Sequence, residues 1–225
     1  MGLGARQNGG MEPRALAALR RSYELAGLDV ADVDPDPIVQ FGRWLADAVA
    51  AELMEPNALV LATADASGRP RARTVLLKGA DAAGFTFFTN YDSPKSRDIE
   101  QNPHVAATFV WLDLHRQVRV RGLAARVDPA ESDAYFASRP RGSQLGAWAS
   151  PQSEVIADRA ALDALVDRIA AEHGPDVDVP RPANWGGWRL VPHDYEFWQG
   201  RANRLHDRLR YRHGPDAWVI ERLAP

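Results

Sequence analysis

Three potential cations are packed into the five residues Arg204-Leu205-His206-Asp207-Arg208, close to the end of the chain. If this segment is a β-strand, successive side chains point to opposite faces, so Arg204, His206 and Arg208 line one face. A row of cations beside a core is costly unless an anionic or π-rich group lies against it. The row therefore indicates a site for a phosphorylated, aromatic small molecule. A solvated edge strand, whose charges discourage aggregation, explains the same residues.

A second basic stretch runs from Arg71 to Lys78 and has the composition of a strand. Alternation puts Arg73 and Lys78 on opposite faces, so they serve one ligand only if the strand ends or bulges near Lys78. Charges on an exposed edge are again the alternative.

Two further segments are suited to holding phosphate. Ser93-Pro94-Lys95-Ser96 follows a predicted strand and opens a predicted helix, where free backbone N–H groups favour anions. It lacks the glycines of a Walker A loop, and Ser and Pro are also ordinary capping residues. In the segment from Tyr135 to Gln144, a helix end leads into a polar basic loop. There Arg139 and Ser143 are suited to a second phosphate, with Tyr135 over a ring; a basic helix terminus is the alternative.

The elements that must position these residues can be read from periodicity and turn signals. Helical spacing covers Glu12–Leu28, Ile38–Leu53 and Asp158–Glu172, and further helix starts occur at Ser93-Pro94 and Asp128-Pro129. Short β-rich runs predict strands over 58–64, 72–78, 85–89, 105–112, 117–127, 185–191, 195–198, 205–211 and 218–223. Many short strands with few helices predict a mainly β (α+β) fold, an antiparallel barrel with peripheral helices. The tryptophans at 185, 188 and 198 are expected in its core.

Composition narrows the chemistry. The chain has 225 residues, 45% of them hydrophobic, a formal net charge of -3 and no cysteine. Disulfides and thiolate catalysis are excluded, a net charge near zero gives no reason to expect nucleic acid or membrane partners, and the six histidines show no metal spacing. The Gly-rich residues 1–10 read as a disordered leader, with Met1 or Met11 as the native start. Residues 11–225 are expected to form one domain, located in the cytoplasm.

Taken together, these stretches resemble the pyridoxamine 5′-phosphate oxidase family, from about Leu19 to Pro225. The motifs that carry the resemblance are Arg73–Lys78, Ser138–Trp148, Glu196–Gly200, Arg204–Arg208 and Glu221–Pro225. The chain departs from the family at Pro94, where Arg is frequent, and at Phe88, where Tyr is common.

The resemblance implies an FMN-binding split β-barrel that forms a homodimer, with FMN in two clefts at the subunit interface. It assigns flavin contacts to Arg73, Val75, Lys78, Phe88, Thr89, Lys95, Gln117, Gln152, Ser153, Trp198 and Arg208. It assigns the substrate phosphate to Lys78, Tyr135, Arg139 and Ser143, and the pyridine ring to the catalytic pair Arg204 and His206. Arg20 and Tyr23 match a segment that folds over the substrate as a lid.

The implied reaction oxidises pyridoxine 5′-phosphate or pyridoxamine 5′-phosphate to pyridoxal 5′-phosphate. A hydride passes from C4′ to flavin N5, and O2 reoxidises the flavin to give hydrogen peroxide. Three alternatives stay open: a related flavin oxidoreductase of phenazine-type secondary metabolism, a non-catalytic flavin or pyridoxal-phosphate carrier, and a split-barrel protein that uses a deazaflavin. The combination of Lys78, Tyr135, Arg139 and Ser143 favours a phosphorylated substrate over the first.

Overall fold

The computed structural model describes residues 27–175 and 177–225, and its main feature is one antiparallel sheet of nine strands. The strands are β1 (Ala58–Ala64), β2 (Pro70–Leu76), β3 (Gly79–Asp81), β4 (Gly84–Asn90), β5 (His104–Trp111), β6 (Arg116–Arg126), β7 (Trp185–Gln199), β8 (Asp207–His213) and β9 (Trp218–Arg222). The predicted mainly β, antiparallel fold with peripheral helices is confirmed. The predicted separation of 185–191 from 195–198 is wrong, because β7 runs through both without a break.

The sheet is curled because its two outer strands are joined by a very short connection. Seven strands follow the order β2-β1-β5-β6-β7-β4-β3, and only Leu77 and Lys78 separate the end of β2 from the start of β3. In a flat sheet these outer strands would lie about 29 Å apart, whereas this connection spans at most about 11 Å. The strands therefore close towards a barrel, with Lys78 at the seam, where its backbone N–H donates to the Thr86 carbonyl at 2.8 Å.

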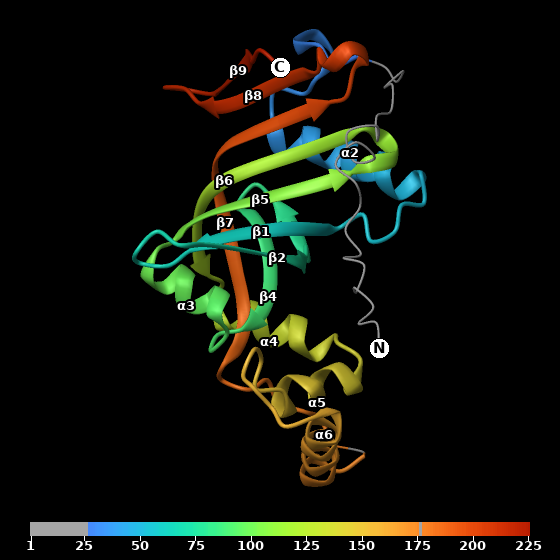
Figure 1. The fold of residues 1–225 in the computed structure, drawn as a ribbon, viewed down its shortest axis with the longest axis vertical. Coiled ribbons are helices and arrows are strands. Elements are labelled where there is room, and N and C mark those ends of the chain that lie inside the picture. The colour runs from blue at the N-terminus through green and yellow to red at the C-terminus, as the bar shows by residue number, and fades with distance from the viewer. Residues whose placement is uncertain (1–26, 176) are drawn as a thin grey trace, which may run out of the picture.

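The long strand β7 connects the barrel to the C-terminal strands. It pairs with β6 over Trp188–Gln199, with β4 over Trp185–Leu190 and with β8 over Asp194–Gln199. Figure 1 shows the result: β8 and β9 lie at one end of the molecule, and α4, α5 and α6 lie at the other. Residues near the two ends of β7 therefore belong to different regions.

The helices are α2 (Pro37–Ala50), α3 (Pro94–Gln101), α4 (Pro129–Ala137), α5 (Arg141–Ala149) and α6 (Arg159–His173), with 3₁₀ turns η1 (Val30–Asp32), η2 (Leu112–Leu114) and η3 (Ala202–Arg204). The local sequence explains why α4 starts at the predicted position. The Asp128 carboxylate accepts a hydrogen bond from the Ala130 N–H at 2.8 Å, and Pro129 takes the first helical position. The polar loop predicted around 139–143 is wrong beyond Pro140, since α5 begins at Arg141. None of the helices in the described part of the chain has the length and apolar character to cross a membrane.

Within the described residues, two hydrophobic cores join the helices to the sheet. The larger lies between α2 and the sheet, where the fully buried Phe41 ring is 4.8 Å from both Phe85 and Phe109, centroid to centroid. The smaller joins α4 and α5 to the start of β7 through Phe136 and Trp185. The buried Trp185 and Trp188 confirm the core positions expected for them. The helix predicted over Glu12–Leu28, up to residue 26, and the leader at 1–10 lie outside the described residues, and the single domain over 11–225 stays a prediction.

Gly84 provides a test of the packing between β4 and β7. Its φ of 129° suits only glycine, and a Cβ there would overlap the carbonyl of Leu190. We expect Gly84→Ala to lower the free energy of unfolding by about 3 kcal/mol, because backbone must move to remove the overlap. At Gly68, with φ 80° and open space around it, the same change should cost about 1 kcal/mol. Urea unfolding of both variants checks this, and equal losses would contradict it.

Candidate active site

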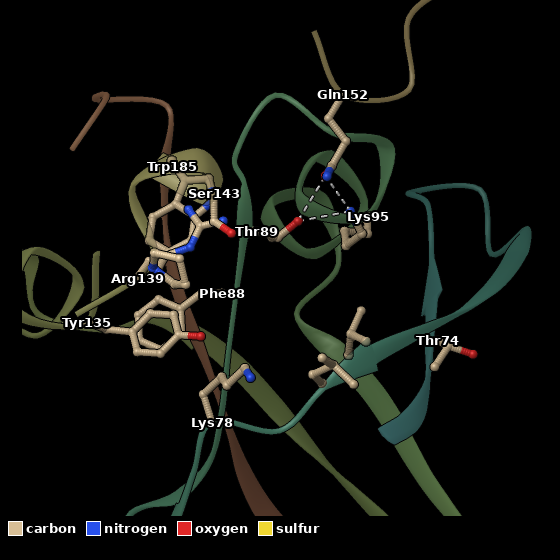
Figure 2. A pocket seen from close by; sticks show the side chains of 13 residues that line it. Thr74, Lys78, Phe88, Thr89, Lys95, Tyr135, Arg139, Ser143, Gln152 and Trp185 are labelled. Carbon is tan, nitrogen blue, oxygen red and sulfur yellow. Dashed lines mark hydrogen bonds between the residues drawn. The ribbon is translucent and has the colours of Figure 1, made fainter. Parts of the chain in front are cut away.

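A cavity of about 490 Å³ opens between the barrel seam and helices α4 and α5. Its lining comes from six elements and their connections: Thr74, Val75, Leu76, Lys78, Phe88, Thr89, Lys95, Tyr135, Arg139, Pro140, Ser143, Gln152 and Trp185. Figure 2 shows two polar groups facing this space, with Lys78, Tyr135, Arg139 and Ser143 on one side and Thr89, Lys95 and Gln152 on the other. We call these groups the α4–α5 wall and the Lys95 wall.

The α4–α5 wall is assembled from segments that the fold fixes independently. Lys78 projects from the seam because β2 ends at Leu76, just before it. Tyr135 lies in the last turn of α4 and stacks on Phe88 of β4, with ring centroids 4.0 Å apart. Ser143 lies in the first turn of α5, and not in the loop expected from the sequence.

Arg139 of this wall has a guanidinium that is partly buried and not ion-paired with any described residue. Its Nη1 is buried and has no hydrogen-bond partner, and its side chain makes no ion pair with a described carboxylate. Burial lowers the pKa of its guanidinium, although an arginine stays protonated at neutral pH. A half-buried, uncompensated cation with an unused donor is suited to an anionic ligand.

The Lys95 wall also carries a cation without a carboxylate partner. The Lys95 ammonium donates to Thr89 Oγ1 at 3.0 Å, Ser93 Oγ at 3.1 Å and Gln152 Oε1 at 2.8 Å, all of them neutral acceptors. Burial, with the nearby charge of Arg73 as a second cause, lowers the pKa of Lys95 to about 8. An anion bound next to Lys95 would offset the electrostatic cost of burying the charges of Lys95 and Arg73.

Arg73 lies behind this wall and does not line the cavity. Its Nη1 donates to the Leu61 carbonyl at 3.1 Å and to Thr63 Oγ1 at 2.8 Å, and its Nη2 is 4.0 Å from the buried Asp98 carboxylate. Asp98 also pairs with Arg71, so it balances Arg73 only in part.

The start of α3 differs in detail from the predicted phosphate cradle. The hydroxyls of Ser93 and Ser96 are fully buried and donate to the Asn90 carbonyl at 2.7 and 3.0 Å. They therefore brace the turn before the helix. Of this segment, Lys95 lines the cavity, whereas Ser93 and Ser96 do not.

A second group of predicted residues forms a row across three strands. Gln117 of β6 lies opposite Trp198 of β7, which lies opposite Arg208 of β8, and the His206 ring is 4.6 Å from the Trp198 ring. We call Gln117, Trp198, His206 and Arg208 the C-terminal row. Unlike the cations of the cavity, Arg208 is ion-paired: its Nε lies 2.8 Å from Glu196 Oε1, and this carboxylate raises the pKa of Arg208.

The single strand face predicted for Arg204, His206 and Arg208 is wrong. Strand β8 begins at Asp207, and Arg204 ends the 3₁₀ turn η3 with a left-handed φ of 63°, next to Asn203 at 57°. The turn instead fixes His206, whose Nδ1 accepts the Arg201 backbone N–H at 3.1 Å. Burial and the charge of Arg204 lower the pKa of His206, which favours the neutral ring.

The structure thus divides the predicted site residues. It gathers nine of them around one cavity: Val75, Lys78, Phe88, Thr89, Lys95, Tyr135, Arg139, Ser143 and Gln152. Gln117, Trp198, Arg204, His206 and Arg208 lie elsewhere in the chain's fold, and Ser153 is exposed in the loop beside Gln152. Arg20 and Tyr23 lie outside the described residues. Sequence reasoning assigned Trp185 to the core alone, since a tryptophan opening a strand gives no sign that one face borders a cavity.

Comparisons with known proteins identify the family of the chain. Residues 45–173 match the family model described as pyridoxamine 5′-phosphate oxidase, and residues 185–225 match the pyridoxine 5′-phosphate oxidase C-terminal dimerisation region. The pyridoxine/pyridoxamine 5′-phosphate oxidase of Paraburkholderia phymatum is 56% identical over 211 residues, which cover 93% of this chain and 99% of that relative. That of Burkholderia mallei is 55% identical over 213 residues, with the same coverage of both chains.

Two solved structures are also similar. PhzG from Burkholderia lata 383, in complex with tetrahydrophenazine-1-carboxylic acid, superposes with a TM-score of 0.84 at 32% identity, covering 91% of this chain and all (100%) of that one. A pyridoxamine 5′-phosphate oxidase-related, FMN binding protein from Nostoc punctiforme gives 0.65 at 22% identity, over 81% and 96% of the two chains, and supports the fold alone. The family models and the extent of these identities lead to one conclusion: the chain belongs to the pyridoxamine 5′-phosphate oxidase family.

Proposed function

We propose that this protein is an FMN-dependent oxidase that converts pyridoxine 5′-phosphate or pyridoxamine 5′-phosphate to pyridoxal 5′-phosphate. The observation that carries the proposal is the α4–α5 wall, where Lys78, Arg139, Tyr135 and Ser143 face one cavity and Arg139 keeps a buried, unused donor. Two cations and two hydroxyls that line one side of a cavity are suited to a phosphate dianion. They would anchor the substrate at a distance from the carbon that reacts.

The Lys95 wall, on the other side of the cavity, is suited to the phosphate group of FMN. Lys95 and Arg73 bring two cations close together, and the neutral acceptors around Lys95 do not cancel its charge. Pro94 supplies no cation where relatives often have Arg, so Lys95 and Arg73 would carry the electrostatic part of the binding. Bound FMN supplies the redox chemistry, accepting a hydride from the substrate and returning to its oxidised form with O2.

We further propose that each site is completed by a second copy of the chain. The C-terminal row and Arg204 lie apart from the cavity in one chain, and the row falls within the matched dimerisation region except for Gln117. In a homodimer, Arg204 and His206 of the partner subunit would hold the pyridine ring, and Gln117, Trp198 and Arg208 would contact the flavin. A neutral His206, held by the Arg201 N–H, would donate from Nε2 to the substrate.

The phenazine-type alternative rests on the similarity to PhzG. A phenazine carboxylic acid carries one carboxylate and no phosphate, so it would not require the full set of donors on the α4–α5 wall. The cationic character of that wall favours the phosphorylated substrate. The expected cytoplasmic location stays a prediction.

The visible spectrum of the purified protein tests the function. We expect flavin absorbance that bleaches on anaerobic addition of pyridoxine 5′-phosphate and returns with O2, while pyridoxine without phosphate bleaches it far more slowly. Bleaching by a dihydrophenazine carboxylic acid alone would instead support the phenazine-type reaction. Flavin that no substrate bleaches would support a carrier.

Mixing two variants that are each impaired at a substrate concentration near the wild-type KM tests the shared site. Arg139→Ala removes an anchor of the α4–α5 wall, and Arg204→Ala should cut turnover by about 100-fold while flavin content is retained. A mixed dimer has one site with both lesions and one intact site, so random one-to-one mixing should restore about a quarter of wild-type activity. Each variant refolded with itself is the control. No recovery, with mixed dimers shown by mass spectrometry, would mean that each site is built from one chain.

The pH dependence of FMN binding tests the role of Lys95. Its pKa of about 8 means that the free site loses the ammonium as the pH rises. A bound phosphate raises that pKa, so binding takes up a proton above pH 8. Between about pH 7, where the phosphate is already a dianion, and pH 8, the affinity for FMN should be nearly constant. Above pH 8 the affinity should fall by up to about tenfold for each pH unit.

Lys95→Arg is the matched control, because a guanidinium stays protonated across this range. Flavin fluorescence quenching measures both titrations. The same decline in Lys95→Arg would show that another group causes it.

A further inference from the structure

Trp185, the first residue of β7, is 6% exposed and borders the cavity beneath Arg139. The guanidinium carbon of Arg139 lies 4.5 Å from the Trp185 ring centroid and 5.5 Å from that of Phe136. In Figure 2 Arg139 lies beside the Trp185 ring, on the same side of the cavity as the stacked pair of Phe88 and Tyr135. The head group of Arg139 therefore lies against two aromatic rings.

These rings are the contacts that the structure shows for the guanidinium. The side chain of Arg139 has no carboxylate partner among the described residues, and its buried Nη1 has no hydrogen-bond partner at all. An arginine side chain has several rotatable bonds, so an unheld head group would sample many positions. Contact with a π-face restrains a cation to a plane without occupying its N–H groups.

Trp185 is itself held firmly. Its ring is nearly parallel to those of Phe88 and Tyr135, with interplanar angles of 12° and 8°, and meets Phe136 edge-on at 69°. Its carbonyl accepts from Arg181 Nη1 at 2.6 Å, and its N–H donates to the Pro182 carbonyl at 3.0 Å. The ring is thus a rigid platform anchored at the start of a central strand.

A carboxylate in the place of this ring would also hold Arg139, with a different consequence. It would cancel the charge and occupy the donors that an anion needs, as Glu196 does for Arg208. An aromatic platform restrains the cation and leaves its charge and edge available.

We infer that Trp185 is a positioning residue, which holds the uncompensated Arg139 guanidinium in place so that the α4–α5 wall selects a phosphate dianion. The inference rests on the proposed function for the identity of the substrate. It adds a role in substrate specificity for Trp185, which contacts Arg139 and not the reacting atoms. A residue that served the core alone would contribute to stability without any coupling to Arg139.

A double-mutant cycle with Arg139 tests this inference. Trp185→Leu should raise the KM for pyridoxine 5′-phosphate about tenfold, because a desolvated cation–π contact is lost. The kcat should change by less than about twofold, since the contact is made equally in ground and transition states. Trp185→Phe, which keeps a smaller π-face, should raise KM only about threefold.

The decisive arm is the Arg139→Ala background, where Trp185→Leu should change KM by less than about twofold because the cation it positions is gone. Trp148→Leu is the matched control: this tryptophan lies on α5, the helix of Ser143, is 39% exposed and does not border the cavity. It should leave KM unchanged. A rise in KM of equal size with and without Arg139, or a loss confined to kcat and flavin content, overturns the inference.

Anion binding separates this inference from the proposed reaction. Isothermal titration calorimetry with pyridoxal 5′-phosphate and with inorganic phosphate should show the same coupling between Trp185 and Arg139 in the dissociation constants. A wild-type protein that binds these anions through Arg139 and Trp185 but oxidises neither substrate would refute the proposed function and keep the inference. A wild-type protein that binds neither anion overturns the inference as well.

Discussion

The two-residue connection between β2 and β3 is the constraint on which the rest of the structure depends. Leu77 and Lys78 tie together the outermost strands of a seven-strand path, so the sheet has to curl. The curl brings β2 and β4 to opposite sides of one cavity and puts Lys78 at the seam between them. Helices α4 and α5 then close that cavity, because Phe136 and Trp185 share the smaller core.

Charge is distributed over this frame in two different ways. Around the cavity, Lys95 and Arg139 are surrounded by neutral acceptors and aromatic rings, so their charges are not cancelled. In the C-terminal row, Arg208 is paired with Glu196. Burying an unpaired cation costs free energy, and uncompensated cations of this kind are typical of functional sites. The contrast supports the proposed role of the cavity in phosphate recognition, and the proposed function places the C-terminal row at the flavin and substrate rings.

The length of β7 explains why one chain keeps these groups apart. Trp185 at its start borders the cavity, whereas Trp198, close to its end, lies in the C-terminal row. A fully extended segment of this size spans tens of ångströms. The matched dimerisation region covers β7 to the C-terminus, which is consistent with a second chain supplying the row.

The sequence by itself determined the elements and the chemical character of the site. Helix starts at Asp128-Pro129 and the alternation within strands depend on near neighbours, so they can be read locally, and the motifs identified the family. Only the tertiary structure decided that Arg204 sits in a left-handed turn, that the serines before α3 brace Asn90, and that Trp185 lies beneath Arg139. The reason is that Arg139 and Trp185 are 46 residues apart in the sequence. Their contact depends on how the sheet curls and where α4 and α5 dock on it, and no local pattern carries that information.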